Sequence, residues 1–210
     1  MISLLSAQWA CRLSMECNWN PFAARTYLVI SGNFKPQILV AMPSLQDGYF
    51  DKSVIYLCDY NASGAMGFVV NSPSSTTVDE LLSELGMKSF EEQKKQILIG
   101  GPVQPELCWV VHSSDYECSS STTLGDDLAI SAAQEVLTGI ADGNAPNEYI
   151  LGVGYAGWGP GQLDREIEED AWWLAEMNLR SVLEHSHESR WDAVMNHLGL
   201  TSESAHCYKV

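Results

Sequence analysis

Residues 154–173 read Gly-Tyr-Ala-Gly-Trp-Gly-Pro-Gly-Gln-Leu-Asp-Arg-Glu-Ile-Glu-Glu-Asp-Ala-Trp-Trp, and this stretch is the most informative part of the chain. Its glycines permit positive φ angles and close backbone approach, whereas Tyr155 and Trp158 need large surfaces to pack against. The combination predicts one particular rigid turn followed by a helix, not a solvated linker. The stretch holds no recognisable nucleophile, metal-ligand set or phosphate-binding loop, so it says more about the fold than about a reaction.

Hydrophobic periodicity in the rest of the chain predicts an α+β fold. Short apolar runs indicate about six strands, and apolar positions at i, i+3, i+4 and i+7 indicate about four helices. The expected strands are residues 38–42, 53–60, 65–70, 96–99, 107–112 and 148–153, and the expected helices begin after Thr77, after Ser131, near Gln162 and near Arg190. We expect the third helix to continue to about Leu174. Because strands and helices do not alternate strictly, the pattern predicts a single domain with a mixed sheet.

Two of the expected helices begin with a capping box. Thr77 with Glu80, and Ser131 with Gln134, have the spacing at which a hydroxyl caps one free amide and the later side chain reaches back to another. We expect Ser189 to cap the last helix.

The charge of the chain restricts its partners. The formal net charge is −16, from 27 acidic and 11 basic residues. Nucleic-acid binding usually needs clustered Lys and Arg side chains that release counterions. The charge therefore argues against direct nucleic-acid binding, although the acidity could simply serve solubility.

The cysteines and the apolar runs predict the compartment. None of the six cysteines forms a C-x-x-C pair, and Cys58 and Cys108 lie in apolar strand-like runs where a reduced thiol behaves as a small hydrophobe. A disulfide framework is not expected in a chain of 210 residues with this much core. No apolar run reaches the length of a membrane-spanning helix. We therefore expect a cytoplasmic protein with no membrane contact.

Residues 1–36 differ from the remainder of the chain. They are more basic, richer in Trp and Cys, and without periodicity. We interpret them as an N-terminal extension outside the core fold, and residues 37–210 as the folded domain.

Three glycines match a nucleotide-binding pattern. Gly152, Gly154 and Gly157 fit G-x-G-x-x-G after an expected strand. A dinucleotide site places the third glycine in the helix that meets the pyrophosphate, whereas residues 158–161 delay the helix here. Too few residues follow for the remaining βαβ units, so we expect a structural turn and no cofactor.

Two histidines and one Cys–His pair have side chains of the type that binds metal ions. His185 and His187 would point to one side of an extended segment, but no Cys or third His is close in sequence. Cys108 and His112 are four residues apart on an expected strand, which separates them by about 13 Å. We therefore favour a solvated histidine pair and expect no metal site.

A pair of carboxylates follows the glycine-rich turn. Glu166 and Asp170 are expected four residues apart on one helix face, beside Gln162. Such pairs can perform acid–base chemistry or bind a cation, but most belong to a solvated face. Since the chain also lacks a G-x-S-x-G nucleophile elbow, we assign no catalytic residue.

Several blocks of sequence, in order, resemble one family. They are Leu39–Leu45 with Asp47, Phe50, Ser53, Val54 and Cys58; then Asn61, Gly64–Gly67, Asn71 and Pro73; then Gly100–Val103, Gly154–Trp158, Gly161–Leu163, Glu166, Ile167, Arg190, Trp191, Leu198 and Gly199. Across roughly residues 37–200 the chain resembles the bacterial AlgH/YqgE family. The resemblance implies a single α+β domain with a mixed, bent, barrel-like sheet. It also implies a cytosolic bacterial protein labelled as a transcriptional regulator linked to alginate production, with no established activity or ligand.

Four positions depart from the family pattern. Tyr60 stands where His is common, Ser72 replaces a usual Lys or Arg, and Leu107 stands where Arg is common. Asp170 replaces a usual Asn. The loss of basic positions and the added acid weaken any anion or nucleic-acid site there.

Two functional hypotheses follow. The first is a non-enzymatic regulator that acts through a protein partner or a small ligand. The second is a small-molecule-binding protein or enzyme with a pocket formed by the 154–166 and 42–53 segments. The candidate lining residues are Ser44, Asp47, Tyr155, Trp158, Gln162 and Glu166. An exposed apolar patch would favour the first hypothesis, and a buried Glu166 beside Tyr155 the second.

Overall fold

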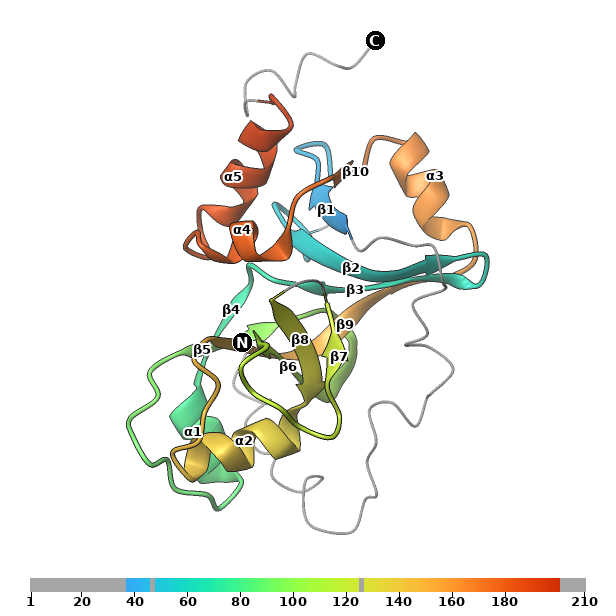
Figure 1. Cartoon of the computed structure of the whole chain (residues 1–210). Helices are drawn as coiled ribbons and strands as arrows, with labels where there is room; N and C mark the ends of the chain where they lie inside the picture. Colours follow the sequence, from blue (N-terminus) through green and yellow to red (C-terminus); the bar gives the residue numbers. More distant parts are fainter. Residues whose placement is uncertain (1–36, 46–47, 125–126, 201–210) are drawn as a thin grey trace. The chain divides into compact units, whose positions relative to one another are not determined.

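The computed structural model describes residues 37–45, 48–124 and 127–200 (Figure 1). The chain divides into two compact units. Unit 1 contains the described residues of 74–98 and 104–153, and unit 2 contains those of 37–73, 99–103 and 154–200. The expected extension, residues 1–36, lies outside the described residues. Strands and helices are both present without strict alternation, so the expected α+β class is confirmed.

Unit 2 is built on an antiparallel sheet. Its strands are β1 (Gln37–Ala41), β2 (Val54–Asn61), β3 (Gly64–Val69), β10 (Trp172–Ala175) and the second half of β9 (Tyr149–Trp158). They lie in the order β10-β1-β2-β3-β9. The predicted hairpin between β2 and β3 is confirmed, because Asn61 pairs with Gly64 and its Oδ1 accepts the Ser63 amide at 2.7 Å.

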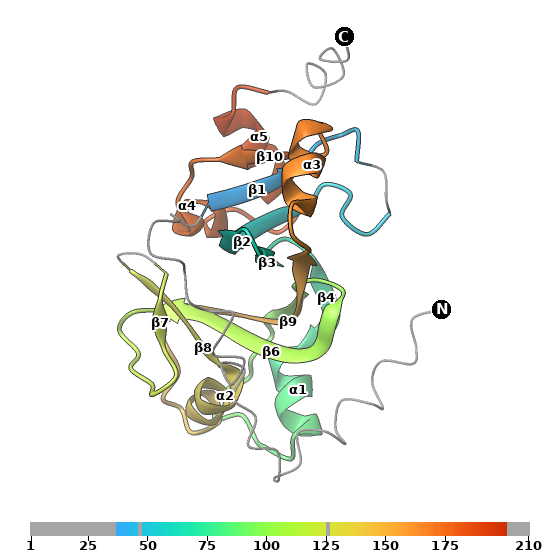
Figure 2. The ribbon, with the colours of Figure 1, turned by 90° about the vertical axis from the view of Figure 1, so that its right-hand side faces the viewer.

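Three helices cover this sheet. They are α3 (Gln162–Glu168), α4 (Leu179–Leu183) and α5 (Arg190–His197). Figure 1 and Figure 2 show α3 on one side of β1 and β10, with α4 and α5 on the other side. The apolar core under α3 includes Leu39, Leu57, Trp158, Leu163 and Trp172, all buried.

Unit 1 combines a second group of antiparallel strands with two helices. Its strands are β4 (Pro73–Thr77), β5 (Gln96–Ile99), β6 (Val103–Ser113), β7 (Thr122–Thr123), β8 (Leu128–Ala132) and the first half of β9. The order is β9-β6-β8-β7, and β5 pairs with both β4 and β9. The helices α1 (Val78–Glu84) and α2 (Ala133–Ala141) share one core with β6 and β9.

The first predicted capping box is confirmed. Thr77 Oγ1 accepts the Glu80 amide at 3.3 Å, and Glu80 Oε2 accepts the Thr77 amide at 2.8 Å. Two of the free amides at the start of α1 are thereby satisfied.

Replacing Thr77 by alanine is expected to lower the free energy of unfolding by about 1 kcal/mol, because an N-cap acceptor is lost. Urea denaturation followed by circular dichroism measures this difference. Ser83→Ala, at an exposed position in the same helix, is the control and should be neutral or slightly stabilising. Equal stability of Thr77→Ala and wild type would contradict the capping role.

The second predicted capping box is wrong. The N-cap of α2 is Ala132, without a side-chain hydrogen bond, and Ser131 belongs to β8. The Ser131 hydroxyl is buried and lies 2.7 Å from His112 Nε2, so it is engaged elsewhere. The cap predicted at Ser189 also forms no side-chain bond to its helix, because Ser189 Oγ donates to the Ser186 carbonyl.

The prediction for residues 154–174 was partly wrong. Strand β9 continues to Trp158, so only residues 159–161 turn before α3. Helix α3 ends at Glu168, because Asp170 has a φ of 54° that no right-handed helix contains. Residues 172–175 then form β10 and pair with β1, in place of the last helical turn that we expected.

Candidate functional site

The carboxylate of Glu166 joins three side chains at the glycine–tryptophan corner. Its Oε2 accepts the indole N–H of Trp158 at 2.8 Å and that of Trp172 at 2.9 Å. Its Oε1 accepts Nε2 of Gln162 at 2.8 Å. Gln162 in turn accepts the Gly159 amide on its Oε1 at 3.0 Å. Helix α3 is thus fixed to the end of β9 and the start of β10.

The two indoles belong to a row of aromatic rings. Trp158 and Trp172 meet edge to face, with centroids 5.9 Å apart, and Phe50 meets Trp172 in the same way at 5.6 Å. Tyr49 continues the row at 4.9 Å from Phe50, but its side chain is 48% exposed. Edge-to-face pairs stabilise such a row beyond the area that they bury. The row therefore leads from the buried corner to the surface.

These contacts define what Glu166 can do chemically. Indole N–H groups are donors only, so they use the carboxylate as an acceptor and supply no proton to it. Three of its roughly four acceptor positions are occupied within the protein. Glu166 is therefore arranged to hold the two indoles in place. A general acid or base would instead need a free oxygen that faces a substrate.

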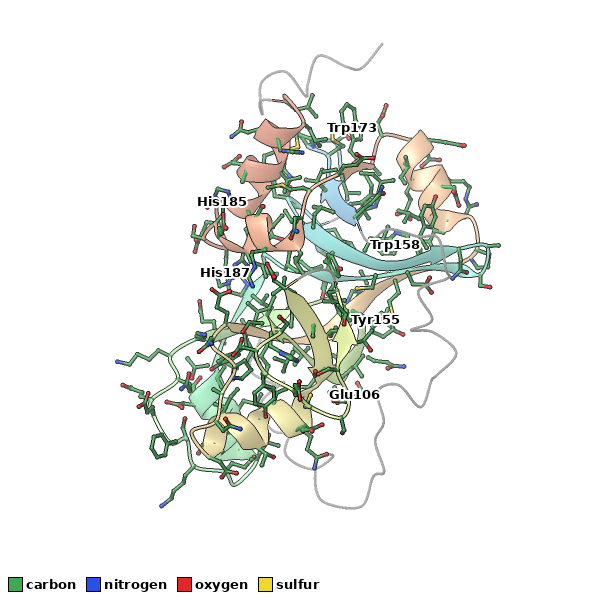
Figure 3. The ribbon with its side chains drawn as sticks, in the orientation of Figure 1. Glu106, Tyr155, Trp158, Trp173, His185 and His187 are labelled. Carbon is green, nitrogen blue, oxygen red and sulfur yellow. The ribbon has the colours of Figure 1, made fainter. Side chains whose placement is uncertain are left out.

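Three of the predicted site residues lie together. Trp158, Gln162 and Glu166 form the contacts described above. Tyr155 is three positions before Trp158 on β9, and because side chains alternate along a strand it points to the opposite face. Both side chains are labelled in Figure 3. The structure therefore does not place Tyr155 with Glu166.

The predicted loop side of the pocket is only partly described. Ser44 is near the end of α3, where its Oγ donates to the backbone carbonyl of Asp170 at 3.0 Å. The Met42 amide donates to the carbonyl of Ala171 at 3.0 Å. Asp47 lies outside the described residues. The 42–45 segment is thus bonded to residues 170–171, and Ser44 is used in that connection.

Asp170 does not share a helix face with Glu166, which corrects the predicted carboxylate pair. It follows the end of α3 in the left-handed conformation, with a φ of 54°. Its Oδ1 accepts the indole N–H of Trp173 at 3.3 Å. Asp and Asn tolerate left-handed φ better than most residues, because their short polar side chains can form local hydrogen bonds.

Replacing Asp170 by asparagine is expected to raise the free energy of unfolding by about 0.3–1 kcal/mol, since it removes a negative charge near a helix C-terminus. The amide oxygen keeps an acceptor for Trp173. Asp170→Val is the contrasting variant and should cost about 1–2 kcal/mol, because a branched side chain is strained at this φ. Thermal and urea unfolding of both variants measure the difference, and a more stable Asp170→Val would refute the assignment.

The other predicted ligand patterns do not assemble a site. Gly152, Gly154 and Gly157 all lie within β9, so they do not form a strand-to-helix phosphate turn. A Cβ at Gly152 would lie 2.2 Å from the Trp109 ring, which explains this glycine by packing. Among residues 37–45, 48–124 and 127–200, no group of three His, Cys, Asp or Glu side chains is arranged to hold a metal ion.

The histidine pair lies at the connection between α4 and α5 (Figure 3). His185 is exposed and His187 is partly buried. Burial, and then the charge of Arg190, lowers the pKa of His187, which favours its neutral form.

A buried arginine next to these histidines was missed as an anchor. The guanidinium of Arg190 donates to three backbone carbonyls, those of Val70, His185 (3.1 Å) and Leu183 (3.4 Å). Only 4% of the residue is exposed, and burial lowers the pKa of Arg190 to about 10. The next residue, Trp191, donates its indole N–H to the Ala41 carbonyl at 2.8 Å. Both residues therefore tie α5 to the sheet of unit 2.

Comparisons with known proteins agree with this fold. The sequence model of a protein family described as AlgH-like matches residues 38–203 of this chain. A UPF0301 protein of Shewanella loihica is 38% identical over 177 residues, which cover 80% of this chain and 96% of that protein. The solution structure of the AlgH protein from Pseudomonas aeruginosa superimposes with a TM-score of 0.67 at 34% identity, covering 88% of this chain and 95% of the other. A crystal structure of a Corynebacterium diphtheriae protein, with a TM-score of 0.60 at 24% identity, shares the fold. The chain therefore belongs to the AlgH-like family.

Proposed function

We propose that the protein is a non-enzymatic cytoplasmic regulator that acts by binding a protein partner through unit 2. The binding region is a patch that we call the aromatic–acidic surface, formed by Tyr49, Phe50, Glu168, Glu169 and Asp170. The observation that carries this proposal is the exposure of Tyr49, whose ring continues the row from the buried Trp158 and Trp172 through the partly buried Phe50 to the surface. Exposed aromatic rings are frequent anchors of protein interfaces.

The acidic part of this surface lies beside the aromatic part. Ser44 bonds to the Asp170 carbonyl and Phe50 packs on Trp172, so the loop and the end of α3 adjoin. Glu168, Glu169 and Asp170 are all exposed. Acidic residues at a helix C-terminus oppose the helix dipole, so these residues are poorly suited to stabilising α3. They suit a partner that presents basic side chains around an apolar contact.

Catalysis at the corner has less support than binding. Glu166 is occupied by three internal donors, and Ser44 by the Asp170 carbonyl. A small-molecule pocket between the 154–166 and 42–53 segments would have to displace these bonds. The alternative hypothesis of an enzyme or ligand-binding protein is therefore the second choice.

Charge supports a protein partner over DNA. The Lys and Arg residues in the described part of the chain are Lys52, Lys88, Lys94, Lys95, Arg165, Arg180 and Arg190. Arg190 is buried, and the others are spread along both units. Neutralising a phosphate backbone needs several such groups together.

Site-specific photo-crosslinking in cells of the organism that naturally expresses the protein tests the proposal. A photoreactive phenylalanine at position 49 should crosslink to a defined protein. The yield should fall strongly in the Glu168→Lys/Glu169→Lys background. The matched control, Glu91→Lys/Glu92→Lys, makes the same charge change at exposed positions of unit 1 and should leave the yield unchanged.

Three results would overturn the proposal. They are crosslinks that neither charge variant alters, crosslinks to nucleic acid, and the absence of any protein adduct. A thermal-shift screen against metabolites tests the alternative hypothesis of a ligand-binding protein or enzyme. A bound metabolite at a hundred times its dissociation constant stabilises the folded protein by about 2.7 kcal/mol. Stabilisation that Gln162→Ala abolishes would favour the ligand-binding hypothesis.

A further inference from the structure

A second cluster of reactive side chains lies in unit 1. His112 is on β6, Ser131 is on β8, and Cys118 and Ser121 are on the connection between β6 and β7. The Cys118 Sγ is 3.1 Å from Ser131 Oγ, which is 2.7 Å from His112 Nε2. His112 and Ser131 are each 1% exposed, whereas Cys118 is only partly buried. The cluster thus has a thiol near the surface and a base in the interior.

The hydrogen bonds of this cluster have a defined direction. His112 Nδ1 is 2.9 Å from the Ser113 carbonyl oxygen, which can only accept, so Nδ1 carries the proton. In the neutral ring Nε2 is then the acceptor, and the Ser131 hydroxyl donates to it. The Ser131 oxygen is left to accept from the Cys118 thiol. The bonds from Cys118 through Ser131 thus run toward His112, and Ser121 Oγ also lies 2.9 Å from the Ser131 oxygen.

Further hydroxyl groups surround the sulfur. Ser121 Oγ is 3.1 Å and Ser120 Oγ is 3.5 Å from the Cys118 Sγ. Hydroxyl donors at these distances stabilise a thiolate. Glu135 holds the segment from the other side, because its carboxylate accepts the amide and the hydroxyl of Ser119, both at 3.0 Å. These contacts position the sulfur against the Ser131 hydroxyl.

The other titratable groups near this chain are two acids and a phenol. The pKa of Asp115 is lowered, mainly by its hydrogen bond to the Ser113 side chain. The nearby His112 adds a smaller contribution in the same direction. Tyr116 packs edge-on against the His112 ring, with centroids 5.6 Å apart. The hydrogen bonds that Glu135 accepts from Ser119 lower the pKa of its carboxyl group and so favour the charged form. Both carboxylates therefore lie beside the chain of bonds from Cys118 to His112.

We propose that Cys118 is a modification site that reacts with small disulfides, with His112 taking up its proton through Ser131. The Cys118 thiolate attacks one sulfur of a low-molecular-weight disulfide, the S–S bond of that disulfide breaks, and a mixed disulfide with Cys118 forms. The thiolate that leaves takes a proton from water and departs as a thiol, and His112 returns the proton that it took up to solvent. Cys118 is oxidised and half of the disulfide is reduced, so no further reactant is needed. His112 and Ser131 act as positioning residues for this step.

The other two cysteines that the structure describes provide internal controls. Cys58 and Cys108 are free thiols that are only 2% and 3% exposed. Burial raises the pKa of both thiols, that of Cys108 to about 12. They should react with a small disulfide only when the protein unfolds.

The reduced full-length protein is treated with oxidised glutathione, quenched with acid, and digested for mass spectrometry. At pH 7 we expect Cys118 to form the mixed disulfide at least about tenfold faster than N-acetylcysteine, and Cys58 and Cys108 to remain unmodified. Ser131→Ala should slow Cys118 by about tenfold or more, because the proton path is broken. Ser131→Thr keeps the hydroxyl and should restore most of the rate. Ser114→Ala, which removes an exposed hydroxyl on the same connection, should leave the rate nearly unchanged.

Two results would overturn the proposal. One is a wild-type Cys118 rate no greater than that of N-acetylcysteine. The other is an equal Cys118 rate in Ser131→Ala, Ser131→Thr and wild type. Formation of a mixed disulfide at the buried Cys108 in the same digests identifies any variant that has unfolded. If a variant has unfolded, the comparison of the wild-type Cys118 rate with that of N-acetylcysteine tests the proposal by itself. The proposal does not depend on the partner-binding function assigned to unit 2.

Discussion

Replacing Glu166 by alanine is expected to lower the free energy of unfolding by about 3 kcal/mol, because two buried indole N–H groups lose their acceptor. Trp158 and Trp172 are 8% and 2% exposed, so water cannot readily replace the carboxylate. Gln162 loses its partner as well. Urea denaturation followed by tryptophan fluorescence measures the loss.

The same helix provides the control for this prediction. Glu168→Ala removes an exposed carboxylate two residues away and should change stability by less than about 0.5 kcal/mol. Glu166→Gln keeps one acceptor oxygen and should fall between the two. Similar unfolding curves for Glu166→Ala and Glu168→Ala would show that the indole contacts do not hold the corner.

Replacing Arg190 by alanine is expected to lower the free energy of unfolding by about 3 kcal/mol or more, the second large effect. Three backbone carbonyls lose their partner, and hydrogen bonds from a charged donor are stronger than neutral ones. Through the carbonyls of Val70, Leu183 and His185, this one side chain joins the residue that follows β3 to the α4–α5 region. Thermal unfolding by calorimetry should show a lower Tm. Hydrogen exchange should be fastest in α5.

Arg165→Ala is the matched control, since Arg165 is an exposed arginine on α3. It should leave the Tm nearly unchanged. Arg190→Lys keeps the charge but not the planar fork and should recover only part of the stability. If Arg190→Ala and Arg165→Ala unfold at the same temperature, the anchoring role of Arg190 is refuted.

Local patterns predicted much of the fold. The apolar runs of β1, β2, β3 and β5 were placed within one or two residues, and Thr77 with Glu80 gave the start of α1. In these cases periodicity and capping act within a few residues. The family was also recognised from several short blocks in order, and the matched range of residues 38–203 confirms it.

The errors came from tertiary contacts that a local pattern does not contain. Ser131 has the spacing of a cap, but His112 on the neighbouring strand uses its hydroxyl. Residues 172–175 continue a helical pattern, yet pairing with β1 makes them a strand. Strand β4 was not predicted because its Ser and Thr residues form no apolar run.

The candidate site was predicted in part for the same reason. Trp158, Gln162 and Glu166 are close in sequence, and the i, i+4 spacing brings the last two together. The role of Trp172 depends on the chain reversing at Asp170, which no helical pattern shows. The contact between Cys118 and Ser131 spans 13 residues and two separate elements, so spacing alone could not have suggested it.

The central claim is that the Glu166 carboxylate binds both indoles and makes the glycine–tryptophan corner a rigid part of the fold. Hydrogen exchange of the indole N–H groups, followed by NMR on protein labelled with ¹⁵N-tryptophan, tests it directly. We predict that the Trp158 and Trp172 indole protons exchange far more slowly than that of N-acetyltryptophanamide, and that Glu166→Ala removes this protection. Wild-type indole protons that exchange as fast as the free compound would contradict the account.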